Sequence, residues 1–343
     1  MVYVMLDPVR SALSPLALAL VSFVSCAAYA QTSINDVHIT PRDATPRASG
    51  IELATATTGP KFSGDSLIRT SADLVMVHVT ITDDFNRPVT GLDRENFQVF
   101  ENKKVQPIKN FSSEDSPVSI GIIVDVSGSM GSKLERARDA VRQFCDESNP
   151  QDEFFVITFS DVPALGTNFT DRPEEVENAL LTAQSKGRTS LLDAIYMGIS
   201  KMKEARYSRR ALLIISDGGD NHSRYSERDV KNAVKEADIL IYAVGTFDRY
   251  VSTQEELLGP QLLQSVSDVT GGQAYTLTNE AELPAVTRSI GTRLRHQYML
   301  AYRPETQVRD GKWHKIVVKL RLPSKWPSIL RVNARTGYYA REQ

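Results

Sequence analysis

The chain is short of cysteine, has no excess of either charge, and has no long apolar run beyond its first residues. Its 343 residues include only 2 cysteines, and 40 Lys and Arg against 42 Asp and Glu leave a formal net charge of −2. This balance lacks the basic footprint of a nucleic-acid-binding protein and the strong acidity of a disordered chain. With 41% hydrophobic residues the composition is that of a globular protein, and the length suffices for two domains.

Sequence patterns of common hydrolases are missing as well. Neither the G-x-S-x-G pattern of serine hydrolases nor the H-E-x-x-H pattern of zinc peptidases occurs. The 5 histidines include no pair with the spacing of zinc ligands on one helix. These absences leave a hydrolytic function without a recognisable nucleophile or zinc centre.

The first 30 residues are predicted to be a signal peptide. An apolar stretch from about Leu16 to Val24 is followed by small residues that end in the cleavage pattern A-Y-A at Ala30. The stretch is too short to span a bilayer comfortably. We therefore predict an exported protein, either periplasmic, extracellular or associated with the cell envelope. Its mature chain would begin at Gln31 and contain no transmembrane helix.

Signal-peptide cleavage also decides the role of the cysteines. Cys26 lies within the removed segment, where lipidation is the alternative, although the letters "FVSC" fit a lipobox poorly. Cys145 would then be the only cysteine of the mature chain, so no intramolecular disulfide is possible. We expect Cys145 to be a small buried residue on a helix.

The rest of the chain divides into four segments by pattern. Residues 31–65 are rich in Thr, Ser, Ala, Pro and Gly and are predicted to be a flexible linker. Residues 66–117 hold the alternating stretch "DLVMVHVTITD" and a hairpin around "ENKK", which indicate β-strands. Residues 118–295 alternate strands and helices. Residues 296–343 return to β-structure, with a second hairpin predicted at the turn Asp310-Gly311.

The central segment predicts an α/β fold. Its runs "VSIGIIVD", "EFFVITFS", "RALLIISD" and "DILIYAVG" are continuously apolar and alternate with amphipathic helical stretches. Such runs are typical of a doubly wound, mostly parallel sheet that helices cover on both faces. Each β-segment alone has only three or four predicted strands and one apolar face, which makes it marginally stable. We expect the two to pack as one small β-sandwich in which the α/β domain is inserted or which flanks it; two separate β-modules are the alternative.

Five oxygen-bearing side chains fall where such a sheet forms binding sites, at the carboxyl ends of its strands. The first predicted strand ends at Asp125 and is followed by Ser127 and Ser129, Thr189 comes just before a helix, and Asp217 ends another strand. Alternate residues of an extended segment point the same way. Hydroxyls and carboxylates are hard ligands that suit Mg²⁺ or Mn²⁺ better than zinc or copper. Because the set has only two carboxylates, the ion would have reason to bind another from outside.

Three motifs carry a resemblance to a known family. "DVSGSM", "GRTSLLDAI" and "SDGGD", in this order on an alternating α/β pattern, resemble the von Willebrand factor type A (VWA) domain and its metal-ion-dependent adhesion site (MIDAS). The resemblance covers residues 118 to about 295, and the flanks resemble those of exported bacterial VWFA-related proteins. It implies a six-stranded, Rossmann-like sheet and one divalent ion. The metal residues would be Asp125, Ser127, Ser129, Thr189 and Asp217.

The resemblance also implies a protein or peptide ligand that donates an Asp or Glu side chain to the ion. We therefore predict an exported, non-enzymatic adhesion or protein-binding module. One alternative is a structural scaffold in which the ion only fixes the loops. Another is a metal-assisted hydrolase, although the three motifs offer no histidine or glutamate as a general base.

Three further residues near the motifs have open roles. Asp193 is either an acceptor that orients the Thr189 loop or an acid favoured in the first turn of a helix. Asp220 is either close to a second cation or a turn residue. His222 either faces a ligand or is merely exposed to solvent.

Overall fold

The structure, a computed structural model, describes residues 74–340 apart from four gaps. The gaps are residue 218 and the ranges 248–253, 305–309 and 323–329. The predicted signal peptide with Cys26 and the predicted linker 31–65 lie outside the described residues. The chain divides into two units after Leu67, and everything described belongs to the second. None of the described helices combines the length and the apolar character needed to cross a membrane.

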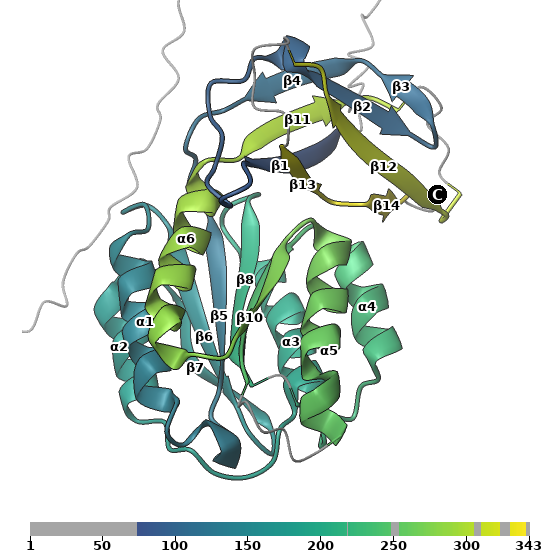
Figure 1. The fold of residues 1–343 in the computed structure, drawn as a ribbon. Coiled ribbons are helices and arrows are strands. Elements are labelled where there is room, and N and C mark those ends of the chain that lie inside the picture. The colour runs from purple at the N-terminus through teal and green to yellow at the C-terminus, as the bar shows by residue number, and fades with distance from the viewer. Residues whose placement is uncertain (1–73, 218, 248–253, 305–309, 323–329, 341–343) are drawn as a thin grey trace, which may run out of the picture. The chain divides into compact units, whose positions relative to one another are not determined.

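A six-stranded sheet forms the centre of the α/β unit, in the order β10-β9-β8-β5-β6-β7 (Figure 1). Five strands run parallel, and only β7 pairs antiparallel, with β6. The predicted fold class is therefore confirmed. The strands are β5 (Ser119–Asp125), β6 (Glu153–Phe159), β7 (Pro163–Thr170), β8 (Arg210–Ser216), β9 (Leu240–Thr246) and β10 (Gln273–Leu277).

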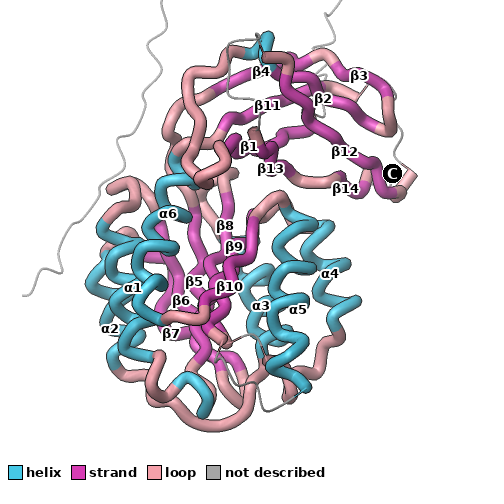
Figure 2. Tube along the Cα trace, viewed as in Figure 1, coloured by secondary structure: helices cyan, strands magenta, loops and turns pink. Residues whose placement is uncertain are grey.

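Helices cover both faces of this sheet (Figure 2). Side chains of α1, α2 and α6 pack into one apolar core and those of α3, α4 and α5 into another. Neighbouring residues of β5 serve opposite faces, Ile122 in the first core and Ile123 in the second. This is why the strand is apolar at every position. The helices are α1 (Leu134–Asp146), α2 (Pro173–Leu181), α3 (Leu191–Lys201), α4 (Glu227–Glu236), α5 (Gln254–Thr270) and α6 (Leu283–Arg295).

Cys145 is buried in the first of these cores, as predicted. It lies on α1, is a free thiol, and is 4% exposed. Burial raises the pKa of the thiol to about 12, and nearby acids including Asp146 add to the effect. The thiol is therefore an apolar packing group rather than a reactive one.

Strands from both flanks of the α/β unit build a β-sandwich of two four-stranded sheets, in the orders β13-β1-β11-β4 and β14-β12-β2-β3. In the first sheet β1 pairs with β11 and β13, and in the second β2 pairs with β12. Each of the two sheets thus contains strands from both flanks. The segment boundaries 66–117, 118–295 and 296–343 stay predictions. The strands are β1 (Val75–Thr82), β2 (Phe97–Glu101), β3 (Lys104–Gln106), β4 (Ile108–Ser112), β11 (Tyr298–Tyr302), β12 (Trp313–Leu320), β13 (Arg331–Ala334) and β14 (Gly337–Tyr339).

One of the two predicted hairpins is confirmed and the other is wrong. Glu101 faces Lys104 across the turn between β2 and β3, and both central residues have the positive φ of a tight hairpin turn. At Asp310-Gly311 the chain does turn, and Gly311 has φ +64°. However, the strands on either side, β11 and β12, belong to different sheets. Each pairs instead with a strand from the N-terminal flank.

Arginines join the sandwich to the α/β unit. Arg293 of α6 is 1% exposed, and its guanidinium donates to Gln273 Oε1 at 2.6 Å and to the backbone oxygen of Asn86 at 2.8 Å. Arg335, next to β13, pairs with Asp238 at 2.5 Å. Separating the sandwich from the α/β unit would leave Arg335 and Asp238 without their charged partners and would remove the Asn86 acceptor from buried Arg293.

The imidazole of His314, in the sandwich, is hydrogen-bonded to two acidic side chains. Its Nδ1 lies 2.6 Å from Glu101 Oε1, and its Nε2 lies 3.3 Å from Asp310 Oδ1. Burial lowers the pKa of the ring, but the hydrogen bonds to these two acids outweigh it, and the pKa is raised above the usual value. The folded state therefore holds its proton more tightly than the unfolded chain does.

This raised pKa makes the stability of the sandwich depend on pH. Below the unfolded-state pKa of about 6.5 the His314 contribution is complete, and it disappears as the pH rises through the folded-state pKa. We expect the free energy of unfolding, from urea titrations at about pH 6 and about pH 9, to fall more in the wild type than in His314→Gln. Equal falls in the two proteins would contradict the assignment.

Candidate metal-binding site

The two predicted carboxylate ligands lie at the same edge of the sheet. Asp125 is the last residue of β5, and Asp217 directly follows β8. These strands are parallel neighbours, with Val124 opposite Ile215. Asp125 is fully buried and Asp217 is 4% exposed. Both carboxylates therefore belong to the carboxyl edge of the sheet, where ligands bind in such folds.

Asp125 is fixed by hydrogen bonds to both of its oxygens. Oδ1 accepts from the backbone N–H of Ser127 at 2.8 Å, and Oδ2 accepts from the Ser216 hydroxyl at 2.7 Å. Burial and then the charge of Asp217 raise the pKa of Asp125 to about 7, against the opposing effect of these hydrogen bonds. Two buried carboxylates that repel each other destabilise the fold when no cation is present. A divalent cation between them would neutralise both charges.

The two serines follow Asp125 in the loop 126–131. Ser127 is 1% exposed and ends the extended segment, and Ser129 lies in the short 3-10 helix η2 (Gly128–Met130) that starts next. Their hydroxyl oxygens are 3.0 Å apart. The loop thus presents two neutral oxygen donors together, next to a buried carboxylate.

Thr189 lies in the loop 185–190, just before α3, and is 5% exposed. Its backbone N–H donates to Asn221 Oδ1 at 3.0 Å, and its carbonyl accepts from the N–H groups of Asn221 and His222, both at 3.1 Å. Three hydrogen bonds therefore tie Thr189 to the loop 217–223, which begins with Asp217.

The loop 185–190 is tied to the loop 126–131 as well. Gly128 N donates to Gly187 O at 3.1 Å, and Lys186 N donates to Val126 O at 2.9 Å. The Ser185 hydroxyl also donates to the carbonyl of Ser127. Backbone bonds thus hold together all three loops that carry predicted ligands, and we call them the rim loops.

The structure adds residues that the sequence did not indicate. Ser216 holds the Asp125 carboxylate, and Asp161 Oδ1 accepts from the backbone N–H of Arg188 at 3.0 Å. Neither stands in a recognisable motif, although Ser216 directly precedes the predicted ligand Asp217. Both residues make these contacts only because the fold brings distant parts of the chain together. In the described part of the chain, no cluster of three or more His, Cys, Asp or Glu side chains has the geometry of a metal site, so a cation here would depend on hydroxyl donors.

The open roles of the neighbouring residues are settled in part. Asp193 accepts from the backbone N–H groups of Arg224 and Tyr225, so it braces the chain after the third rim loop. Asp220 Oδ2 accepts from Leu192 N at 2.8 Å and holds the first turn of α3. His222 is exposed, and its Nδ1 lies 3.3 Å from Nη1 of the neighbouring exposed Arg188.

Gly187 offers a test of the loop geometry. It has φ +84°, and a Cβ there would lie 2.6 Å from Asp161 Oδ2. Gly187→Ala should therefore displace Asp161 and the Thr189 backbone, at a cost of about 1–2 kcal/mol in stability. We expect Mg²⁺ affinity by calorimetry to fall roughly tenfold, since loss of groups that orient ligands costs 10–100-fold.

Gly131→Ala is the matched control for this change. Gly131 lies in the same rim with φ −49°, and a Cβ would make only ordinary contacts, the nearest at 3.5 Å. It should bind Mg²⁺ like the wild type. A loss of affinity of similar size in both variants would contradict the specific role given to Gly187.

Comparison with known proteins identifies relatives of the α/β unit. Residues 120–219 match the family model described as the von Willebrand factor type A domain. Inter-alpha-trypsin inhibitor heavy chain H3 of Homo sapiens is 27% identical over 172 residues, 45% of this chain and 19% of that protein. An uncharacterized protein of Borreliella burgdorferi is 21% identical over 185 residues, 47% of this chain and 54% of that protein. The chain thus spans about a fifth of the heavy chain's length.

Solved structures also resemble parts of the chain. The structure titled von Willebrand factor type A from Catenulispora acidiphila has a TM-score of 0.47 at 14% identity, covering 79% of this chain and 64% of that one. The vWF domain of the type V pili tip protein Mfa5 from Porphyromonas gingivalis has a TM-score of 0.43 at 12% identity, covering 51% of this chain and 94% of that one.

Proposed function

Because this chain contains a von Willebrand factor type A domain, matched over residues 120–219, we propose that it is a binding module that captures a partner through a divalent cation. The observation that supports the proposal is that two buried carboxylates, Asp125 and Asp217, follow neighbouring parallel strands at one edge of the sheet, and that the hydroxyls of Ser127 and Ser129 lie 3.0 Å apart in the loop after Asp125. The backbone of Thr189 is bonded to the same loops. This set of hard oxygen donors suits Mg²⁺ or Mn²⁺.

Each of the five side chains has a role in this proposal. Asp125 and Asp217 supply the negative charge, and Ser127, Ser129 and Thr189 supply neutral oxygens. The bound ion would supply positive charge that attracts an Asp or Glu carboxylate of a protein or peptide partner. The chain itself holds these donor atoms in place. The hydrogen bonds among the rim loops fix their positions in the absence of a partner.

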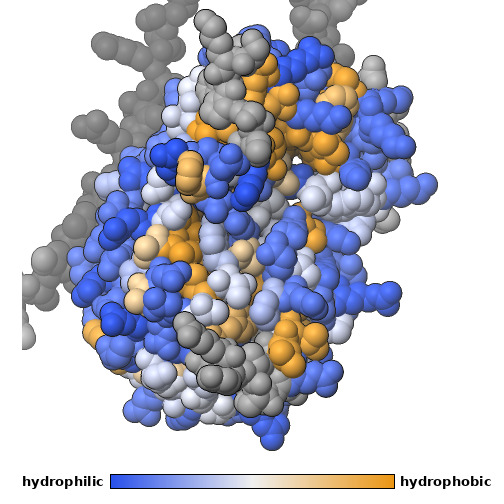
Figure 3. Space-filling view, in the orientation of Figure 1, coloured by the Kyte–Doolittle hydropathy of each residue, from blue (hydrophilic) through white to orange (hydrophobic). Residues whose placement is uncertain are grey.

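Apolar side chains are positioned to add contact area around the ion. Leu257 and Leu258, at the start of α5, are 63% and 51% exposed, and Val162, which follows β6, is 65% exposed. Figure 3 shows an apolar area over α5 on an otherwise mostly hydrophilic α/β unit. Since α5 and Val162 follow the carboxyl ends of β9 and β6, they lie towards the same edge as Asp125. A partner would then present its acid next to apolar residues.

The proposal includes export and the absence of catalysis. The predicted signal peptide would direct the module to the periplasm, outside the cell or to the cell envelope, where an adhesion protein would meet its partners. A loop-fixing scaffold and a metal-assisted hydrolase remain the two alternatives. A scaffold would show metal-dependent stability without selective capture, and a hydrolase would need a base that the five-residue set does not include.

Capture that depends on metal separates these alternatives. We expect exported and envelope proteins from the source cell to be retained by the immobilised mature chain in Mg²⁺ and released by EDTA. Asp217→Ala should retain none of them. For a retained partner, changing the contacting acid to its amide should weaken binding by at least ~1 kcal/mol, because charge-assisted contacts exceed neutral ones. Retention that persists in EDTA and in the variant would contradict metal bridging.

A further inference from the structure

A second candidate site lies at the opposite end of the sheet from the rim loops. A cavity of about 180 Å³ opens between the sandwich and the α/β unit, and its lining includes Met76, His78, Met299 and Arg209. Arg209 directly precedes β8, whereas Asp217 directly follows it. A seven-residue strand spans roughly 20 Å, so this cavity is separate from the proposed Mg²⁺ site.

Strand register places an imidazole and two thioethers on one face. His78 of β1 is directly opposite Met299 of β11 in the antiparallel ladder. Met76 lies two residues before His78 on the same strand, so it points to the same side. Cross-strand partners have Cβ atoms about 5 Å apart, and diagonal neighbours are within reach of long side chains. All three side chains line the cavity.

His78 has no partner for either of its ring nitrogens. It is 9% exposed, and neither Nδ1 nor Nε2 has a hydrogen bond in the structure. Buried polar atoms without partners are rare in folded proteins and call for an explanation. Burial lowers the pKa of His78, assisted by Arg209 and Arg335 and opposed by Asp238. The lowered pKa favours the neutral ring, which is the form that binds metals.

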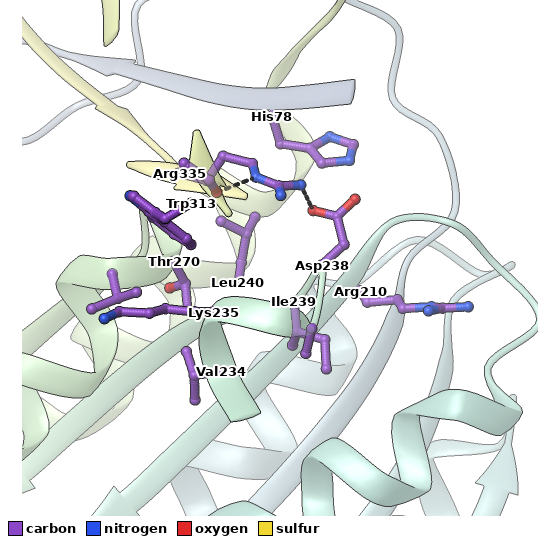
Figure 4. Close-up of a pocket in the computed structure, with 13 residues that line it drawn as sticks. His78, Arg210, Val234, Lys235, Asp238, Ile239, Leu240, Thr270, Trp313 and Arg335 are labelled. Carbon is purple, nitrogen blue, oxygen red and sulfur yellow. Dashed lines mark hydrogen bonds and ion pairs between the residues drawn. The ribbon is translucent and has the colours of Figure 1, made fainter. Parts of the chain in front are cut away.

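Figure 4 shows that the charged side chains near His78, Arg335 and Asp238, bond to each other and not to the imidazole. His78 lines a smaller neighbouring pocket together with Asp238 and Arg335. The Arg335 guanidinium is directed to Asp238 at 2.5 Å and to the backbone oxygen of Gly337 at 3.0 Å, not to the imidazole. The imidazole thus keeps both nitrogens available beside an ion pair that is already complete.

We propose that Met76, His78 and Met299 form a binding site for a soft monovalent metal ion of the Cu(I) class. Thioether sulfur selects Cu(I) over the hard divalent ions, and imidazole nitrogen also suits copper. The donors differ in kind from the all-oxygen set at the rim loops, so the two sites would not compete for one metal. This inference does not depend on the proposed function.

The charge around the cavity is compatible with a single positive charge. Arg209 lines it, but its guanidinium donates to the backbone oxygens of Ser116 and Leu294 and, at 3.4 Å, to Gln297 Oε1. Asp115 Oδ1, 3.9 Å from Arg209 Nη1, supplies a compensating carboxylate, and Glu114 also lines the cavity. A monovalent ion would meet less repulsion from Arg209 than a divalent ion would.

The test uses Cu(I) itself, with Ag(I) as a surrogate that does not change oxidation state. Both cysteines, Cys26 and Cys145, are replaced by alanine in the full chain so that thiols cannot bind the ion. Anaerobic competition against a chromophoric Cu(I) chelator gives the affinity. We expect one equivalent to bind, and Met76→Leu and Met299→Leu each to weaken binding about tenfold or more. These changes conserve volume and should leave the fold intact.

Two further measurements keep the outcome clear. Met202→Leu is the matched control, because Met202 is fully buried in the apolar core on the α3 face of the sheet and does not line the cavity, and the variant should bind Cu(I) like the parent protein. X-ray absorption of the Cu(I) complex should require both sulfur and nitrogen neighbours, and sulfur in a cysteine-free chain comes from methionine. Absence of binding in the parent protein, or equal affinity in all three Met→Leu variants, would overturn the proposal.

Discussion

Asp125→Asn is expected to abolish Mg²⁺ binding and, without metal, to make the chain more stable. The two effects have one cause. Asp125 is fully buried, and burial together with Asp217 raises its pKa to about 7. At about pH 8 the charge therefore costs folding energy, on the order of 4 kcal/mol, unless a cation neutralises it. The amide removes this cost and the metal affinity together.

The amide can keep the local hydrogen bonds. Its oxygen can accept from Ser127 N, and its NH₂ can donate to the hydroxyl of Ser216 once that hydroxyl rotates. We expect calorimetry to show at least a hundredfold loss of Mg²⁺ affinity, ~2.7 kcal/mol. Thermal scans should show that Mg²⁺ stabilises the wild type but not Asp125→Asn. Asp171→Asn, at an exposed position outside the rim loops, is the control. Equal Mg²⁺ titrations of Asp125→Asn and wild type would contradict the assignment.

Gly272→Ala is expected to destabilise the chain by at least about 3 kcal/mol. Gly272 directly precedes β10, and a Cβ there would lie 1.9 Å from the backbone oxygen of Ile241 in β9. That carbonyl cannot retreat, because β9 is held between β8 and β10. The Gly272 N–H also donates to the Thr270 hydroxyl at 3.1 Å, which fixes the turn. Urea unfolding of wild type and variant measures the loss.

Gly219→Ala is the matched control for this substitution. No atom lies within 4 Å of a Cβ built at Gly219, so the change should alter the free energy of unfolding by less than about 0.5 kcal/mol. If Gly272→Ala were as stable as Gly219→Ala, the close packing of β10 on β9 would be wrong.

The sequence predicts the centre of the sheet well and its edges poorly. β5, β6, β8 and β9 are apolar at almost every position because helices cover both faces. β7 is an edge strand with mostly exposed or half-buried residues, so it has no apolar run to detect. α5 contains Pro260 in its interior, a residue that local rules place outside helices. Both elements form because neighbouring strands and helices supply their partners.

Strand pairing in the sandwich shows a second limit. Turn chemistry at Asp310-Gly311 predicts that β11 and β12 pair, yet they belong to different sheets. The turn signal is local, whereas β1 and β2, which pair with these strands, lie about 200 residues earlier in the chain. No short window of sequence contains that information.

Part of the candidate site could be predicted from the sequence, and part could not. Asp125, Ser127 and Ser129 stand in one short motif at a strand end, so their common location follows from the period of an extended chain. The contacts that fix the second rim loop, Asp161 to Arg188 and Asn221 to Thr189, join residues that are distant in sequence. These supporting residues have no motif of their own and become visible only in the folded chain.

The central claim is that three rim loops hold one divalent cation through oxygen atoms. The most direct test is an anomalous difference map from crystals of the chain grown in Mn²⁺. We predict one strong peak at bonding distance, about 2.0–2.3 Å, from an Asp125, Ser127 or Ser129 oxygen, with Thr189 and Asp217 in its coordination sphere directly or through water. A map at saturating Mn²⁺ with no peak among these five residues would contradict the account.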